Sequence, residues 1–193
     1  VSVRIVQETV TANEARKRRM ALKVVDALDG DVQGRTIAVL GLTFKPDTDD
    51  MRDAPSVPLI ETLQRFGANI RAHDPVGMDN ASRILSDVEF CDDAYECARG
   101  ADAVVVITEW DSIRKIDLAR LKKTMRQAVL IDLRNAFAPG VAEDLGFRVS
   151  AIGRSAPRQD IVITAAPTHT APLPTSATGH THSESLGGSV VNT

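Results

Sequence analysis

The chain has 193 residues, of which 43% are apolar, and its 23 Lys and Arg residues are outnumbered by 26 Asp and Glu residues, so its formal net charge is −3. That length is enough to bury a core, since one domain typically takes about 150 residues. The negative charge argues against a general binder of nucleic acid, which needs an excess of cations. The sequence has neither an apolar run of about 18 residues nor a secretory signal pattern, so we expect no membrane span and a cytoplasmic location.

The first segment has the apolar periodicity of one long helix, which runs through residues 3–28 and ends at Gly30. We therefore assign residues 1–29 to the end of a long helix. Its cationic run, residues 16–19, is typical of a solvated helix face, with an anion-binding patch as the alternative. Because the chain starts at Val1 with no capping residue before the helical pattern, we expect it to be part of a longer polypeptide.

The central segment alternates between strand and helix patterns. Strand patterns occur at residues 36–41, 69–72, 88–90, 103–108, 128–133 and 147–152. Helical patterns occur at residues 57–66, 92–99 and 118–125. Strands and helices that alternate at this spacing predict an α/β fold with a Rossmann-like, doubly wound parallel sheet, which we assign to residues 30–153.

The last segment, residues 154–193, is rich in Ser, Thr and Pro and has no aromatic residue. Such a composition predicts a disordered tail, because too little apolar surface is available to offset the entropy of ordering. One short strand pattern occurs at residues 161–164. His169, His180 and His182 lie in this tail without acidic or thiol neighbours, so we expect no metal site there.

Three cations follow strands of the predicted sheet. Lys45 and Arg52 lie in the long connection after the first strand, residues 42–54, and Arg134 follows the fifth strand. Ligands of open parallel sheets bind beyond the carboxyl ends of the strands, so we expect these cations to converge there on a diphosphate group. The alternative for each cation alone is an exposed side chain paired with a nearby aspartate.

The connection after the first strand lacks the G-x-G-x-x-G pattern of dinucleotide-binding sites. Gly41 is the only glycine between Arg35 and Gly67, so we expect no standard nicotinamide site within this domain. Polar residues also follow the second and fourth strands, at Asp74 and Glu109.

Four blocks of sequence stand in order along about a hundred residues. They are GLTFKPDTDDMRDAPS (Gly41–Ser56), AHDP (Ala72–Pro75), YECARGADAVVVITEWD (Tyr95–Asp111) and IDLRN (Ile131–Asn135). Together they resemble the C-terminal, UDP-binding portion of the UDP-glucose/GDP-mannose dehydrogenase family, and most of all the UDP-glucose 6-dehydrogenases. That resemblance implies oxidation of UDP-glucose to UDP-glucuronate with two NAD, and a role in supplying UDP-glucuronate for polysaccharide.

The resemblance also implies roles for individual residues. Phe44 and Lys45 would contact the UDP-sugar, with Lys45 near the diphosphate, and Arg134 would bind the same ligand. Arg52 would reach NAD that is held mainly by another half of the enzyme. Residues 1–29 would belong to the long helix through which such enzymes form a homodimer.

The family's dinucleotide-binding half and the motif that presents its catalytic cysteine have no counterpart in this sequence. Cys97 falls on a predicted helix and Cys91 lies in no matching motif, so we expect the chain alone to be inactive. UDP-N-acetylmannosamine and UDP-N-acetylglucosamine remain alternative substrates, although the run at residues 108–111 is closest to the glucose enzymes. A stand-alone UDP-sugar-binding module without catalysis and a dimerising piece with a vestigial pocket remain alternative functions.

Overall fold

The computed structural model describes residues 19–153. Residues 19–27 are helical. The strands are β1 (Thr36–Leu40), β2 (Asn69–His73), β3 (Val88–Phe90), β4 (Ala103–Val106), β5 (Val129–Asp132) and β6 (Arg148–Ala151). The helices are α2 (Ser56–Arg65), α3 (Met78–Ser82), α4 (Ala94–Cys97), α5 (Asp111–Arg114), α6 (Leu118–Thr124) and α7 (Val141–Asp144). The predicted start of the long helix, the tail and its three histidines lie outside the described residues.

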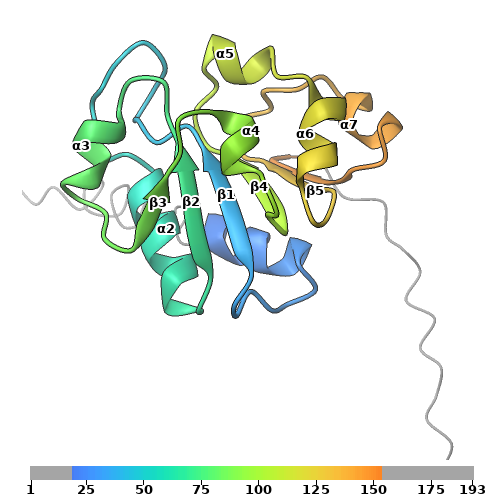
Figure 1. The fold of residues 1–193 in the computed structure, drawn as a ribbon, viewed down its shortest axis with the longest axis horizontal. Helices are drawn as coiled ribbons and strands as arrows, with labels where there is room; N and C mark the ends of the chain where they lie inside the picture. The colour runs from blue at the N-terminus through green and yellow to red at the C-terminus, as the bar shows by residue number, and fades with distance from the viewer. Residues whose placement is uncertain (1–18, 154–193) are drawn as a thin grey trace, which may run out of the picture. The chain divides into compact units, whose positions relative to one another are not determined.

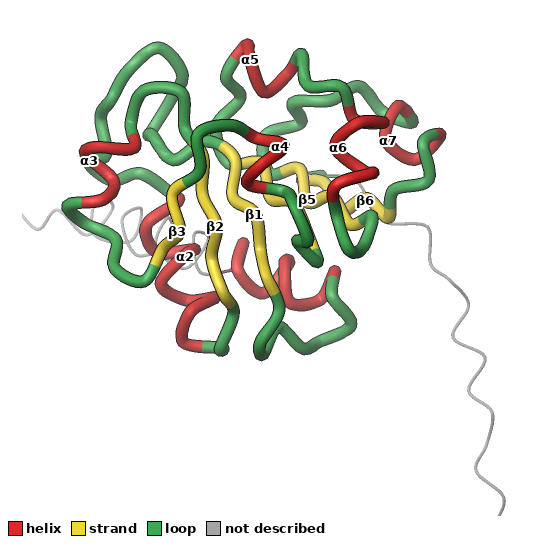
Figure 2. Tube along the Cα trace, in the orientation of Figure 1, coloured by secondary structure: helices red, strands yellow, loops and turns green. Residues whose placement is uncertain are grey.

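The six strands form one parallel sheet in the order β3-β2-β1-β4-β5-β6 (Figures 1 and 2). The order reverses between β1 and β4, where Val39 of β1 is in register with Ala72 on one side and Val105 on the other. This topology confirms the predicted α/β, doubly wound fold. In such sheets the point of reversal opens a crevice at the carboxyl ends of the strands.

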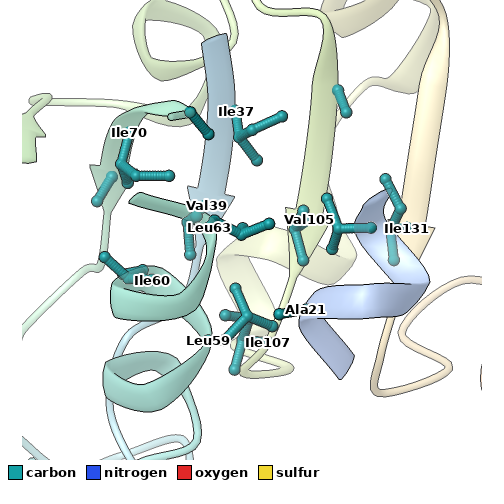
Figure 3. Close-up of a cluster of buried hydrophobic side chains, with 14 of the residues drawn as sticks. Ala21, Ile37, Val39, Leu59, Ile60, Leu63, Ile70, Val105, Ile107 and Ile131 are labelled. Atoms are coloured by element: carbon teal, nitrogen blue, oxygen red, sulfur yellow. The ribbon is translucent and has the colours of Figure 1, made fainter. Parts of the chain in front are cut away.

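One face of the sheet packs against α2 and helix 19–27. Side chains at alternate strand positions, such as Ile37, Val39 and Val105, contact Leu63 of α2 and its neighbours in one apolar cluster (Figure 3). Ala21, Val24 and Leu28, from helix 19–27 and the turn that follows it, join the same cluster and are fully buried. The end of the predicted long helix is therefore part of the core.

The opposite face is covered by the shorter helices, with α4 and α6 in front of the sheet in Figure 1. The intervening strand positions, among them Leu40 and Val106, pack there against Cys97 of α4 and Leu121 of α6. Because both faces are covered, all four residues of β4 and of β5 are buried, as the wholly apolar sequence of β4 predicted.

The helices differ more from their predicted bounds than the strands do. The helix expected at residues 92–99 is limited to α4, which begins after Asp93, whose carboxylate caps the N–H groups of Tyr95 and Glu96. Sequence periodicity did not predict α3, α5 and α7. Each has only four or five residues, which is too short to show a helical repeat.

Candidate functional site

The connections that follow β1 and β4 meet at the carboxyl edge of the sheet, beside the reversal of strand order (Figure 1). Gly41 begins the first connection with φ of +83°, and a Cβ atom there would lie 2.6 Å from the carbonyl oxygen of Thr108. The Thr108 hydroxyl donates a 2.6 Å hydrogen bond to the carbonyl oxygen of Thr43. Glycine at position 41 thus lets the two connections approach closely.

A buried carboxylate, that of Asp74 at the end of β2, joins these connections. Its oxygens accept hydrogen bonds from the N–H of Leu42 (2.6 Å), Thr43 (3.2 Å), Val76 (3.0 Å) and Gly77 (2.7 Å), from the Thr43 hydroxyl (3.4 Å) and from the Trp110 indole (3.0 Å). These donors come from the segments after β1, β2 and β4. Asp74 therefore orients three strand ends at once.

The same hydrogen bonds keep Asp74 ionised. Burial alone would raise the pKa of Asp74, but the surrounding backbone N–H groups together hold it below its usual value. Its side chain is fully buried, so the charge is an internal anchor and is not available to a ligand.

Two of the predicted ligand contacts, Phe44 and Lys45, extend from this anchored segment. Phe44 is 48% exposed, and its N–H donates to the Asp50 carbonyl oxygen at 2.9 Å, which closes the loop behind it. Lys45 is exposed and has no ion-pair partner among residues 19–153. An exposed aromatic residue followed in sequence by an exposed lysine suits an anionic ligand with a ring system.

Arg52 lies at the far end of the same connection, with its side chain 89% exposed. It makes a fork-like ion pair with Asp50, with Nε–Oδ1 and Nη2–Oδ2 distances of 2.9 Å and 2.8 Å. Hydrogen bonding to Arg52 lowers the pKa of Asp50 to about 2. The alternative anticipated from the sequence, pairing with an aspartate of the same loop, is therefore what the structure shows for Arg52.

Arg134 follows β5, and two carboxylates fix it. The carboxylate of Asp132, itself buried, accepts from the Arg134 N–H at 3.1 Å and from the N–H groups of Ala136 and Phe137 at 3.0 Å and 3.1 Å. Glu109, which follows β4, accepts from the Arg134 guanidinium through Nε at 2.5 Å and Nη2 at 2.9 Å. Hydrogen bonding to Arg134 lowers the pKa of Glu109, and the same bond raises the pKa of Arg134.

All three predicted cations lie in connections at the carboxyl edge, but they form two groups. Lys45 and Arg52 both act electrostatically on Asp50. Arg134 pairs instead with Glu109 across the β4–β5 pair. Within the described part of the chain, no hydrogen bond or ion pair joins the two groups.

The sequence flagged Asp74 and Glu109 only as polar residues after strands, and it did not flag Asp132. One available signal was an Asp that ends an otherwise apolar strand, as in the run VLID of β5. A charged residue at such a position needs internal donors, and the N–H groups of the following turn provide them.

A hollow of about 840 Å³ lies at the opposite, amino edge of the sheet, lined by Thr36, Asn69, Arg71, Glu89, Arg126 and neighbouring residues. Two of its three arginines pair with carboxylates of the protein, and the third, Arg99, has no ion-pair partner among residues 19–153. Arg71 pairs with Glu89 at 2.8 Å, and Arg126 pairs with Asp102 at 2.9 Å. We therefore place the candidate site at the carboxyl edge, where Lys45 has no ion-pair partner among residues 19–153 and the chain topology favours ligand binding.

The two cysteines and the β1–α2 connection bear on the expected lack of a catalytic cysteine and of a nicotinamide site. Cys91 and Cys97 are free and buried. Hydrogen bonding between the two thiols, together with burial, raises the pKa of Cys97, whereas the same hydrogen bond lowers the pKa of Cys91. The β1–α2 connection has no glycine after Gly41 with which to approach a pyrophosphate. In residues 19–153, no group of three metal-ligating side chains occurs, and no helix is long and apolar enough to cross a membrane.

Comparison with known proteins identifies the family. A family model described as the UDP binding domain of the UDP-glucose/GDP-mannose dehydrogenase family matches residues 38–139, more than half of the chain. The chain belongs to this family. A UDP-glucose 6-dehydrogenase of Rhizobium meliloti is 48% identical over 152 residues, which are 79% of this chain and 35% of that protein.

Solved structures support the same fold. An NDP-N-acetyl-D-galactosaminuronic acid dehydrogenase of Methanosarcina mazei matches with a TM-score of 0.63 and 30% identity, over 74% of this chain and 30% of that one. A UDP-D-ManNAc dehydrogenase of Pyrococcus horikoshii matches with a TM-score of 0.58 and 27% identity, over 73% of this chain and 31% of that one. The chain thus spans about a third of the length of the proteins it matches.

Proposed function

We propose that the chain is the UDP-sugar-binding part of a UDP-glucose 6-dehydrogenase, which converts UDP-glucose to UDP-glucuronate. The observation that supports this proposal most is that buried aspartates fix two connections at the carboxyl edge, the one after β1 and the one after β5. Asp74 holds the segment that presents Phe44 and Lys45, and Asp132 holds the turn that presents Arg134. The curated relative from Rhizobium favours UDP-glucose over the N-acetylated UDP-sugars that the sequence left open.

In this proposal Lys45 and Arg134 bind the diphosphate. The unpaired ammonium of Lys45 supplies charge without fixed direction, whereas the planar guanidinium of Arg134 supplies oriented donors. Phe44, an exposed residue, contacts the ligand through its ring. The proposal assigns the oxidation to residues of the whole enzyme outside this chain, so we expect this chain alone to bind the nucleotide sugar without turning it over.

The remaining parts of the proposal concern the whole enzyme. NAD accepts the hydrides and is held mainly by a part of the enzyme that this chain does not contain, with Arg52 as a contact from this domain. We also propose a homodimer through the helix that ends at residue 27, and a role in polysaccharide precursor supply. The two unpaired cysteines, Cys91 and Cys97, support a reducing, cytoplasmic location.

The proposal is tested by titrating UDP into the 193-residue chain in a calorimeter and repeating the titration with Lys45→Ala and Arg134→Ala. Each variant loses hydrogen bonds to a charged group, so we expect each to weaken binding by about 1.5–3 kcal/mol. Arg65→Ala is the matched control, because Arg65 is an exposed cation on α2 that pairs with Glu61 and lies away from the carboxyl edge. Unchanged affinity in both site variants would contradict the proposed site.

A further inference from the structure

The ion pair between Glu109 and Arg134 uses only part of the guanidinium. Glu109 accepts from Nε and from Nη2, the two groups on one side of the fork. An arginine has five N–H donors, so both N–H bonds of Nη1 and one of Nη2 remain. Among residues 19–153 no acceptor pairs with Nη1, and the Arg134 side chain is 37% exposed. The outer edge of the guanidinium is therefore free for a second, bidentate partner.

Glu109 is itself held firmly, because both of its chain neighbours are anchored. The Thr108 hydroxyl donates to the carbonyl oxygen of Thr43, and the Trp110 indole donates to Asp74. The first contact reaches the segment that carries Lys45 directly, and the second reaches Asp74, which accepts hydrogen bonds from Leu42 and Thr43 of that segment. The Glu109 side chain is only 19% exposed, which restricts the positions open to its carboxylate. Thr108 and Trp110 thus fix the backbone on both sides of Glu109, and Glu109 in turn binds the guanidinium that follows β5.

We propose that Glu109 is a positioning residue that holds Arg134 with its outer edge open to the diphosphate of the nucleotide sugar. This inference rests on the proposed function, since it requires Arg134 to bind that diphosphate. A long, flexible side chain loses rotamer freedom when it binds a ligand, and an arginine already fixed by a carboxylate loses less. Asp132 fixes the backbone of Arg134, and Glu109 fixes its far end.

Glu109 could instead compete with the ligand for Arg134, and this role predicts the opposite change in UDP affinity when Glu109 is removed. Carboxylates and phosphates both form bidentate pairs with arginine, so Glu109 could occupy the place of the diphosphate. In that case removal of Glu109 would strengthen binding. The geometry favours the positioning role, because Glu109 uses the edge formed by Nε and Nη2 and the diphosphate can use the edge formed by Nη1 and Nη2.

The test measures UDP and uridine affinities of the 193-residue chain for the wild type, Glu109→Ala, Arg134→Ala and the double variant. We expect Glu109→Ala to weaken UDP binding by about three- to tenfold, the effect of ordering one long side chain. Uridine, which lacks phosphates, should bind equally to the wild type and to Glu109→Ala. In the Arg134→Ala background, removal of Glu109 should no longer weaken UDP binding. Glu61→Ala, which removes the exposed partner of Arg65 on α2, is the matched control.

Two results overturn the inference. Equal or tighter UDP binding by Glu109→Ala would show that Glu109 does not position Arg134 for the ligand. An equal loss in the presence and absence of Arg134 would show that Glu109 acts through the general structure of the loop. Absence of UDP binding by the wild type would instead refute the proposed function, and this inference with it.

Discussion

Replacement of Asp74 by asparagine probes the anchor that joins three strand ends. Asparagine keeps the size of the side chain but exchanges one oxygen for an NH₂ group, which can only donate. In the wild type one oxygen accepts from Leu42, Thr43 and Trp110, and the other accepts from Val76 and Gly77. If the amide oxygen of asparagine takes the place that accepts from Leu42, Thr43 and Trp110, its NH₂ group faces the N–H groups of Val76 and Gly77, and those two hydrogen bonds are lost. At about 1.5–3 kcal/mol for each bond to a charged group, the variant should lose about 3–6 kcal/mol of unfolding free energy.

This loss is a large part of the roughly 5–15 kcal/mol that stabilises a typical domain. Urea denaturation followed by circular dichroism measures it directly. Asp26→Asn is the matched control, because Asp26 is exposed on helix 19–27 and should change stability by no more than about 0.5 kcal/mol. A loss below about 1 kcal/mol for Asp74→Asn would refute the view that this carboxylate anchors the site.

Two further predictions concern the same edge of the sheet. Gly41→Ala should destabilise the fold by about 2–5 kcal/mol in urea denaturation, because its Cβ would meet the Thr108 backbone at 2.6 Å in addition to the strain of a positive φ. Gly34→Ala, also at positive φ but with open space around it, should lose only about 1–2 kcal/mol, and equal losses would contradict the close-approach argument. The pKa of Asp74 is lower in the folded than in the unfolded chain, so its contribution to stability should be present above its usual pKa of about 3.9 and be lost as pH falls below that value. Urea midpoints measured between about pH 5 and 2.5 should fall less steeply for Asp74→Asn than for the wild type, and identical slopes would contradict the assignment.

The strands were predictable because each leaves a local trace in the sequence. The run AVVV of β4 is apolar at every position, as burial on both faces requires. Strand order leaves no local trace, and only the assumption of a doubly wound sheet placed the connections after β1 and β5 at one edge. Four-residue helices such as α5 escaped prediction because one turn contains no repeat.

The sequence predicted which cations lie at the site, but it did not predict the ion pair between Arg134 and Glu109. Arg52 forms an ion pair with Asp50, two residues earlier, and the nearby aspartates in the sequence already suggested such a pair. Arg134 meets Glu109, which lies 25 residues earlier on the neighbouring strand end. That pairing follows from strand order and not from sequence distance. The role of Asp74 was equally hidden, since residue type alone does not distinguish an internal anchor from a surface aspartate.

The most direct test of the UDP site at the carboxyl edge is amide hydrogen exchange of the 193-residue chain with and without saturating UDP. We predict slower exchange in the connection of residues 42–54 and in the turn of residues 132–137, since those segments carry Lys45 and Arg134. The amino edge, represented by Asn69 and Arg71, should exchange at the same rate in both conditions. Protection confined to that amino edge, or no protection while UDP is bound, would contradict the account.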